Sequence, residues 1–274
     1  MNTLKLLRSA PPTAKFGMIL IAIYAVIAIL TPWIAPHGQA EIVGLEFEPW
    51  GGEFILGTDN LGRDMLSRMF YGIRNSVSIA LATTILSFAL GTVLGLMAAT
   101  LGGWIDQLMS RLVDVLMAIP AILFALLLLT ITGTGIPQMI AIIAVIEATR
   151  VFRLTRATAM NVAVMDFVEA ARLRGEGTFW VIRREILPNI TSPLIAEFGL
   201  RFCFVFLAIS ALSFLGLGIQ PPTADLGAMV RDNAALITFG ELVPLLPAAA
   251  IALLTVAVNF VVDWMLHRAS GLKS

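Results

Sequence analysis

The sequence predicts an all-α integral membrane protein with about six transmembrane helices. Of its 274 residues, 58% are hydrophobic and 13% are charged, whereas soluble domains average about 45–50% apolar and about 25% charged residues. The mean hydropathy of +0.91 agrees with this class. The apolar residues also gather in runs of the length that a membrane-spanning helix needs, which is about 20 residues. The zero formal net charge indicates neither a basic nucleic-acid surface nor an acidic tail.

Six apolar runs are candidate membrane spans. The first follows a short basic tail, as in a signal peptide, but the Thr31–Trp33 sequence after it contains no small-residue cleavage site. Trp33 suits the membrane interface, so we interpret this run as a retained first span. The fourth run carries Glu147 and Arg150 near its end. The six runs cover residues 15–33, 75–99, 108–130, 136–153, 192–215 and 242–265.

The placement of charge predicts the orientation of the chain, because Lys and Arg are enriched in cytoplasmic loops. Both terminal tails carry basic but no acidic residues, and the segment after the fourth span is rich in arginine. Acidic residues outnumber basic ones in the segment after the first span and in the 217–241 loop. The predicted organisation is 1–14 and 266–274 in the cytoplasm, 15–33 as the first span, 34–74 as a periplasmic segment, and 75–265 as the membrane core, with 154–190 as its cytoplasmic segment.

Small and proline residues within the predicted spans are interpreted as structural. Gly91 and Gly95 lie four residues apart, a spacing that allows another helix to approach closely. The prolines of the later spans are expected to kink or begin them. These are Pro120, Pro137, Pro244 and Pro247.

Residue types that would build a catalytic or metal site are sparse. The chain has one cysteine, Cys203, within an apolar run, and its two histidines, His37 and His267, lie at opposite ends of the sequence. Neither a metal-ligand spacing nor a disulfide framework follows from these residues. We therefore expect a chain that is no enzyme and that binds no cofactor or metal itself.

One glycine pair in the outer segment has the spacing of a phosphate-binding loop. Gly57 and Gly62 are five residues apart, but Arg63 and Asp64 stand where such a loop needs Lys and Ser/Thr. No buried strand precedes the pair, and the predicted orientation places it outside the cell, away from ATP. We expect instead a Gly/Asp/Asn turn that caps the helix leading into the second span.

The cytoplasmic segment is predicted to hold two short helices joined by a turn. Residues 167–174 lack helix breakers, and Gly175 and Gly177 can supply a C-terminal cap or a sharp turn. Thr178 could then cap a second helix over 179–186. Pro188 is expected to end that helix soon afterwards.

The second of these helices is amphipathic. Apolar residues recur at helical spacing, while Arg183 and Arg184 lie elsewhere on its circumference. Such a helix could rest on lipid at the membrane surface, or it could dock into a groove of a soluble partner, and periodicity leaves both readings open. The apolar face would comprise Phe179, Ile182 and Ile186, widened by Trp180 and Val181.

The residue identities in this segment resemble the EAA loop of permease subunits of bacterial ABC importers. The family pattern is EAA, three residues, Gly, nine residues, Ile, one residue, Leu-Pro. This chain departs from it at the Ile position, which is Glu185, with Ile186 one residue later. The matching positions are Glu169, Ala170, Ala171, Gly175, Leu187 and Pro188.

The resemblance implies a role for this segment. In the family the loop forms coupling helices that sit in a cleft of the cytoplasmic ATPase. Arg172, Phe179, Trp180 and Ile186 would join the matching positions in that contact. ATP binding would close the ATPase domains and move the docked element, so that the spans behind it tilt and alternate the open side of the channel.

A second resemblance narrows the family. Residues 56–64, Leu-Gly-Thr-Asp-Asn-Leu-Gly-Arg-Asp, closely resemble the LGTDxLGRD signature of the dipeptide/oligopeptide/nickel permease family, specifically its second, C-type subunit. The resemblance covers about residues 15–265. Further agreeing stretches are Arg111–Asp114, Ala118–Pro120, Ser213–Gly218 and Pro222–Gly227.

This resemblance implies a type I ABC importer permease in a bacterial inner membrane. Its partners would be a second, unlike permease subunit, two cytoplasmic ATPase subunits or domains, and an external solute-binding protein. ATP and Mg would be used by the ATPase subunits. Di- or oligopeptides are the expected cargo, with nickel, glutathione or opine-like solutes as alternatives on the same machinery.

Three other function classes make different predictions. An ion-coupled secondary transporter would carry acids near the midplane and internal repeats, and neither is evident in the sequence. A membrane-embedded enzyme would bring together nucleophile, base or metal-binding residues. A scaffold or sensor would need no coupling loop.

Several charged residues lie within or beside the predicted spans, where ionisable groups are functional candidates. Asp114 lies three residues from Arg111, and Glu197 four residues before Arg201, so each acid shares a helix face with a base. We interpret these as locally neutralised pairs. Glu147 is expected to pair with Arg150 or Arg153, or to line the inner mouth.

Overall fold

The structure is a computed structural model that describes residues 10–51 and 53–269, so the predicted tails 1–14 and 266–274 lie partly outside it. The described residues form helices, turns and loops with two isolated β-bridges, which confirms the all-α prediction. The helices are α2 (Pro12–Ile34), α3 (Met65–Leu101), α4 (Gly103–Ala118), α5 (Ala121–Thr132), α6 (Ile136–Ala163), α7 (Asp166–Leu173), α8 (Thr178–Val181), a π-helical turn (Ile182–Ile186), α9 (Leu187–Phe214), α10 (Leu226–Asn233), the 3-10 helix η2 (Ala234–Phe239) and α11 (Leu245–Ala269).

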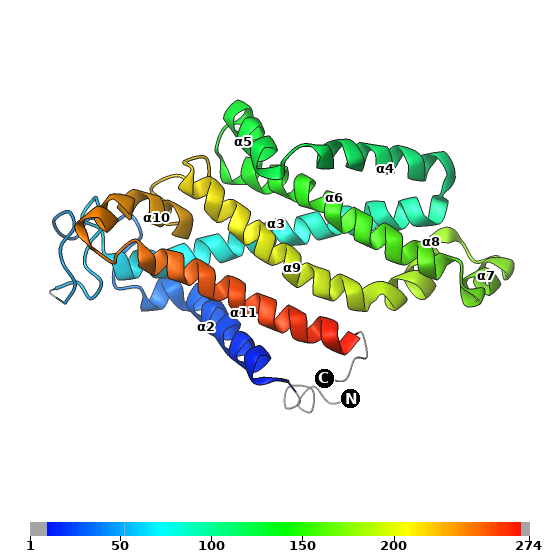
Figure 1. The fold of residues 1–274 in the computed structure, drawn as a ribbon, viewed down its shortest axis with the longest axis horizontal. Coiled ribbons are helices and arrows are strands. Elements are labelled where there is room, and N and C mark those ends of the chain that lie inside the picture. The colour runs from blue at the N-terminus through cyan, green and yellow to red at the C-terminus, as the bar shows by residue number, and fades with distance from the viewer. Residues whose placement is uncertain (1–9, 52, 270–274) are drawn as a thin grey trace.

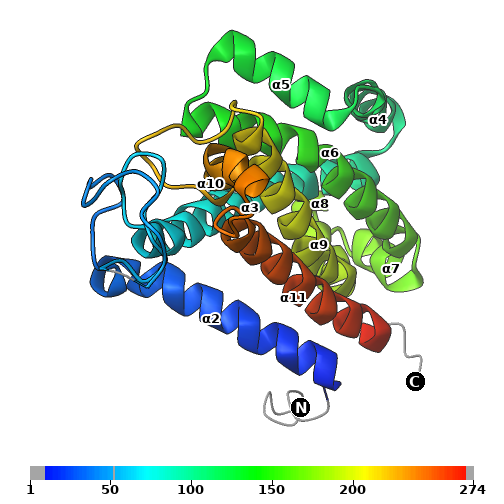
Figure 2. The same cartoon turned by 60° about the vertical axis from the view of Figure 1, so that its left-hand side comes forward.

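The long helices lie side by side along the longest axis of the molecule. In Figures 1 and 2, α6 runs along α3 and beside α9, while α2 packs on α11. The segment between α2 and α3 and helix α10 gather at one end of this bundle, and α7 lies at the other. The first turn of α2 and the last turn of α11 both point toward the α7 end.

Four helical stretches of the described residues are long and apolar enough to cross a membrane. They are α2, α3, the continuous stretch Thr178–Phe214 and α11. The chain is therefore a multi-pass membrane protein. The predicted fourth span lies in α6, which has 28 residues but is not among these stretches. It carries Glu147, Arg150, Arg153 and Arg156.

The predicted third span, 108–130, is not one straight helix. Helices α4 and α5 meet at 88°, and together they form either one broken span or a re-entrant loop. The break falls at Ile119, whose backbone is extended, directly before Pro120. A residue before proline is pushed out of the helical region by the proline ring, so Pro120 ends one helix and begins the next. The expectation that Pro120 kinks or begins a span is confirmed.

The predicted close packing at Gly91 and Gly95 is confirmed, and the neighbour is α6. A Cβ added at Gly91 would lie 2.6 Å from the carbonyl oxygen of Ala148, and one added at Gly95 would lie 2.8 Å from the Cβ of Thr155. Real Cβ atoms do not approach other atoms so closely. Glycine at these two positions therefore lets α3 and α6 run in contact over much of their length.

The 56–64 string folds as a compact turn that caps α3, as predicted. Asp64 is the N-cap, and its side chain accepts hydrogen bonds from the Ser67 N–H at 2.9 Å and the Ser67 hydroxyl at 2.5 Å. Gly57 and Gly62 have positive φ angles of 71° and 72°. A Cβ at either glycine would lie 2.2 Å from a backbone carbonyl oxygen, of Glu48 and Gly44 respectively.

Asp59 is the centre of this turn. One carboxylate oxygen accepts the N–H groups of Leu61 at 2.9 Å and Arg63 at 3.0 Å. The other contacts the guanidinium groups of Arg63 at 2.7 Å and Arg68 at 3.0 Å. Asp59, Arg63 and Arg68 are all buried. This carboxylate therefore joins the outer segment to the first turn of α3.

A second buried carboxylate joins α10 to α3 at the same end. Asp225 is the N-cap of α10 and accepts the Ala228 N–H at 3.0 Å. The Ser76 hydroxyl of α3 donates to its other oxygen at 2.7 Å. Burial raises the pKa of the Asp225 carboxyl above its usual value, against the opposing effect of these hydrogen bonds. Segment 35–64 and helix α10 are thus both anchored on α3.

Candidate functional site

The predicted cytoplasmic segment forms a hairpin of α7 and α8 that projects from one end of the bundle (Figure 1). Helix α7 begins with Asp166 and Glu169 in its first turn and has Arg172 in its last turn. Acidic side chains near a helix N-terminus and basic ones near its C-terminus stabilise it through the helix dipole. The helix–turn–helix prediction for this segment is confirmed.

The turn between the two helices is built on Gly175. Its φ angle is +86°, a conformation that glycine adopts without the strain of a side chain. The Gly175 N–H donates to the Arg172 carbonyl at 2.9 Å, and the Glu176 N–H donates to the Ala171 carbonyl at 3.2 Å. This pair of bonds is the Schellman arrangement that closes helix C-termini. The second helix starts with Gly177 as N-cap, so Thr178, predicted as the cap, is instead its first residue.

The hairpin is fixed to the bundle by an apolar inner face. Val168 and Ala171 of α7, Val181 of α8 and Ile186 of the π-helical turn are at most 1% exposed. They pack in one cluster with residues near the ends of α3 and α6, such as Leu96. Burying a Val or Ile side chain contributes about 1.5–3 kcal/mol. The hairpin is therefore part of the folded core rather than a loose loop.

The outer face of the hairpin leaves several predicted site residues exposed. Phe179 is 75% exposed and Leu173 is 82% exposed. Trp180 is half-buried and packs against the inner cluster, so Phe179 is the most exposed aromatic side chain of the hairpin. The predicted site residues that are also exposed are Glu169, Ala170, Arg172, Gly175 and Pro188.

The residues predicted to form the apolar contact face of the second helix do not all lie on one exposed surface. Phe179 points away from the bundle, whereas Ile186 is fully buried and Leu187 is half-buried. Leu173 was not predicted as a site residue. Its signal in the sequence is a large apolar side chain between Arg172 and Arg174 at the C-terminus of α7.

Pro188 does not end the second helix, contrary to the prediction. The chain stays helical from Thr178 through Pro188 to Phe214. A proline lacks the N–H that would bond four residues back, and its ring clashes with that carbonyl. Here the wider turn Ile182–Ile186 directly precedes Pro188, and the Leu187 N–H donates to the Ile182 carbonyl five residues back. This local π turn accommodates the ring without breaking the helix.

A buried network of charged side chains lies where α6 and α9 pass each other. Arg201 contacts Glu147 at 2.9 Å and Glu197 at 2.7 Å, and Arg150 lies 3.7 Å from Glu147. The predicted Glu197–Arg201 pair is therefore confirmed. Of the partners predicted for Glu147, Arg150 lies within ion-pair distance, but the closer partner is Arg201 of α9. Phe204 lies under both cations, with its ring centroid 4.6 Å from the Arg201 Cζ and 5.8 Å from the Arg150 Cζ.

The prediction that Asp114 is neutralised by Arg111 is wrong. Asp114 lies on α4 and its carboxylate contacts Arg153 of α6 at 2.5 Å. A second pair follows one turn away, because Arg156 binds both oxygens of Asp106. Local spacing could not predict these pairs, since the paired residues lie 39 and 50 positions apart along the chain.

Comparison with known proteins gives consistent matches over most of the chain. Residues 91–269 match the family described as binding-protein-dependent transport system inner membrane component. The chain is 36% identical over 254 residues to the di/tripeptide transport system permease protein DppC of Pseudomonas aeruginosa, covering 90% of this chain and 84% of that protein. It is 34% identical over 257 residues to the dipeptide transport system permease protein DppC of Haemophilus influenzae, covering 91% and 87%. It is also 33% identical over 257 residues to the glutathione transport system permease protein GsiD of Escherichia coli, covering 91% and 83%.

Proposed function

Because the chain belongs to the family of binding-protein-dependent transport system inner membrane components, and is thus a permease subunit of an ABC importer, we propose that it forms one half of a channel for di- or oligopeptides. Separate ATPase subunits would drive this channel by docking on the α7–α8 hairpin. The observation that carries the proposal is the exposed tip of this hairpin, which is fixed to the bundle by a buried face.

The geometry of the hairpin suits force transmission. Its inner face packs on α3 and α6, and its second helix continues into α9, a membrane-spanning helix. A partner that moves the tip therefore acts directly on three long helices. Phe179, Leu173 and Arg172 give the tip apolar and cationic groups, the mixture that favours helix-in-groove docking on a protein.

The chain is proposed to have no ATPase site of its own. Residues 57–64 have the glycine spacing of a phosphate-binding loop but lack its Lys-Ser/Thr pair. Two residues of this stretch, Asp59 and Arg63, form a buried network of ion pairs with Arg68 instead. ATP and Mg would be bound by two ATPase subunits or domains, and this permease would bind no cofactor. Mid-helix acids of the kind used by ion-coupled transporters are present as Glu147 and Glu197, but both are paired with Arg201.

The cargo and the remaining partners follow from the relatives. Relatives with 36% and 34% identity are named for di/tripeptide and dipeptide transport, which favours peptides as the cargo. A relative with 33% identity is named for glutathione, itself a small peptide, and makes glutathione the second candidate. A second, unlike permease subunit and an external solute-binding protein would complete the importer.

The proposed orientation places the hairpin and both termini in the cytoplasm. The ends of α2 and α11 that lead to the termini lie toward the hairpin end of the bundle (Figure 2). The hairpin carries Arg172, Arg174, Arg183 and Arg184, in keeping with the enrichment of basic residues on the cytoplasmic side. The opposite end, with α10 and the acidic segment 35–64, would face the periplasm and the solute-binding protein.

Substitution of Phe179 by Asp tests the coupling proposal. The side chain is 75% exposed, so the permease should fold with stability changed by less than about 0.5 kcal/mol. A charge in an apolar docking groove should nevertheless lower ATP-dependent peptide uptake, and the stimulation of ATP hydrolysis by the binding protein, by about tenfold or more. Uptake of labelled dipeptide into cells and ATP hydrolysis by the purified transporter measure these effects.

The matched control is Leu45→Asp. Leu45 is 77% exposed but lies in segment 35–64 at the other end of the bundle, so its substitution should leave the co-purification of the ATPase subunits with the permease unchanged. A Phe179→Cys variant should also crosslink to an ATPase subunit, whereas Leu45→Cys should not. Wild-type coupling in the Phe179→Asp transporter would rule out the proposed contact.

A further inference from the structure

The charged network between α6 and α9 lies at the middle of both helices. Arg150 is fourteen residues after Ile136 and thirteen before Ala163, the two ends of α6. At 1.5 Å per residue this places it about 20 Å from each end. Arg201 is likewise fourteen residues after Leu187 and thirteen before Phe214 in α9. Arg150 falls within the predicted fourth span, 136–153, and Arg201 within the predicted fifth span, 192–215.

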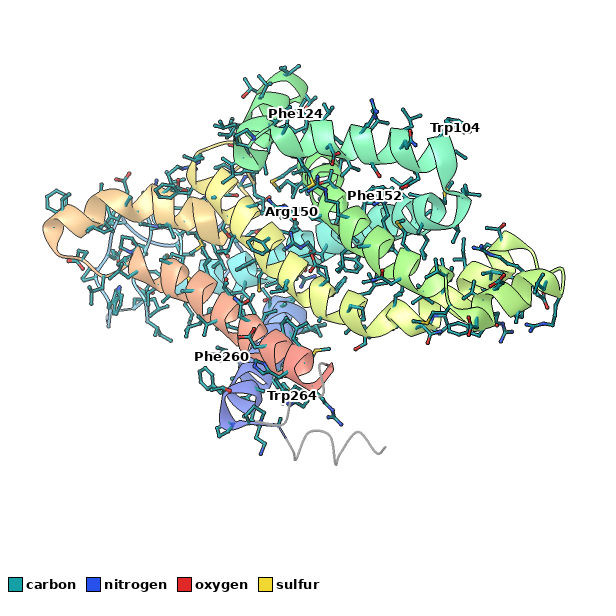
Figure 3. The ribbon with its side chains drawn as sticks, turned by 45° about the vertical axis from the view of Figure 1, so that its right-hand side comes forward. Trp104, Phe124, Arg150, Phe152, Phe260 and Trp264 are labelled. Carbon is teal, nitrogen blue, oxygen red and sulfur yellow. The ribbon has the colours of Figure 1, made fainter. Side chains whose placement is uncertain are left out.

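One of the four charged side chains differs from the others in exposure. The side chains of Glu147 and Arg201 are 6% and 9% exposed, and that of Glu197 is 16% exposed, whereas that of Arg150 is 39% exposed. Figure 3 shows Arg150 near the centre of the bundle, where α6 and α9 pass each other. The most exposed charge of the network is therefore the positive charge of Arg150.

The guanidinium of Arg150 has unused hydrogen-bonding capacity. Its five N–H donors make no hydrogen bond to any residue in the described part of the chain, and its distance to Glu147 of 3.7 Å is longer than a hydrogen bond. Arg201, by contrast, donates to Glu147 and also contacts Glu197. Glu147 thus keeps a close partner without Arg150, and Arg150 keeps its donors free.

A free guanidinium within a predicted span is not expected to face lipid. Charged residues within membrane spans are costly to place against lipid, and they face a water-filled path or another protein surface. The neighbouring Phe204 is 48% exposed and contributes an apolar surface beside the cation. A guanidinium beside an aromatic ring forms a site for a carboxylate attached to a small organic body.

We propose that Arg150 and Phe204 line the translocation path and bind the carboxylate of the passing peptide. The proposal rests on the proposed peptide import and names the permease residues that would touch the cargo. Glu147, close to Arg150 but paired with Arg201, weakens the hold on the anion, so that the peptide binds and leaves again. A carboxylate of the second permease subunit is the competing ligand of the same chemistry.

Uptake measurements on the complete transporter test the role of Arg150. Cells that contain no other peptide importer would express the full system with Arg150→Gln or Arg150→Lys and receive labelled dialanine. We expect uptake to fall about tenfold in the Gln variant and to recover to within about threefold of wild type in the Lys variant, which keeps the charge. ATP hydrolysis stimulated by the binding protein should stay within about twofold in both, because the hairpin is unchanged.

The matched control is Arg153→Gln, one position in the next turn of α6, where the arginine is paired with Asp114. Its uptake should stay within about twofold of wild type. Wild-type uptake by the Arg150→Gln transporter would overturn the inference, and so would a parallel loss of uptake and ATP hydrolysis, which indicates a structural role. If the wild-type transporter imports neither dialanine nor glutathione, the proposed peptide import itself fails, and the inference with it.

A photo-crosslinking amino acid at position 204 separates the two sources of carboxylate. With labelled dialanine, binding protein and a non-hydrolysable ATP analogue present, illumination should attach label to this chain. Unlabelled dialanine in excess should remove that label. A crosslink to the second permease subunit alone, with no peptide adduct, would assign Arg150 to the subunit interface and overturn the proposal.

Discussion

At the scale of single residues, the packing of segment 35–64 on α3 depends on Asp59. Its carboxylate is buried with two guanidinium groups and accepts two backbone N–H groups. Asp59→Asn keeps the shape and an acceptor but removes the charge, leaving Arg63 and Arg68 buried without a counter-ion. Breaking a buried ion pair in this way costs about 3–5 kcal/mol. We therefore expect a clear fall in the thermal unfolding midpoint of the purified transporter.

The control for Asp59 is an exposed acid of the same segment. Glu46 makes no buried ion pair and is exposed, so Glu46→Gln should change stability by less than about 0.5 kcal/mol. Equal unfolding midpoints for the two variants would show that the buried network contributes no net stability. Limited proteolysis of the 35–64 segment gives an independent measurement, because loss of the network should expose it.

At the scale of elements, helix α4 is held to α6 by two ion pairs and by the packing of Val113 on Phe152. An open pocket of about 370 Å³ lies between the two helices and is lined by side chains that include both arginines. Arg156 binds both oxygens of Asp106, whose side chain is 15% exposed. We expect Asp106→Asn to let α4 move away from α6. The distance between spin labels at Leu108 and Met160 should become longer or more broadly distributed.

The second pair supplies the comparison for this prediction. Arg153 and Asp114 have side chains that are 53% and 58% exposed, and exposed pairs contribute about 0–1 kcal/mol. Asp114→Asn should therefore leave the label distances close to those of the unmodified protein. A larger change from Asp114→Asn than from Asp106→Asn would contradict the assignment of Asp106 as the main tether.

At the scale of the whole molecule, the proposed orientation can be measured with single cysteines. Leu45 and Leu173 are 77% and 82% exposed and lie at opposite ends of the bundle, while the native Cys203 is buried. A membrane-impermeant maleimide should label Leu45→Cys in intact spheroplasts. It should label Leu173→Cys only after the membrane is opened. Labelling of Leu173→Cys from outside would reverse the orientation and remove the proposed ATPase contact.

Much of this architecture could be predicted from the sequence, because its signals are local. The apolar runs locate the membrane helices, Gly175 locates the hairpin turn, and Gly91 and Gly95 locate a close helix contact. These features depend on residues a few positions apart. The helical passage through Pro188 could not be predicted, since it depends on a π turn that absorbs the proline without ending the helix.

The pairing of charges marks the other limit of the sequence. The spacing correctly predicted an ion pair between Glu197 and Arg201, which lie one turn apart on the same helix. It predicted Arg111 as the partner of Asp114, whereas the partner is Arg153 on another helix. It also did not place Arg150 and Arg201 at the middle of two crossing helices. Side-chain partners that come from different helices depend on the packing, which local periodicity does not describe.

The unbroken helical stretch from Thr178 to Phe214 has a consequence for how the importer keeps its steps in order. Phe179 and Arg201 lie on this one stretch, twenty-two residues or about 33 Å apart. No loop lies between them that could absorb a movement of one end. Any axial displacement at the tip of the hairpin that neither the Ile182–Ile186 turn nor the helix at Pro193 absorbs would reach Arg201. Arg201 is held by Glu147 at 2.9 Å, so a shift of a few ångströms would break this contact and change the charges along the proposed path. The nucleotide state of the ATPase subunits and the affinity of the permease for its cargo would then change at the same time, through this one helix.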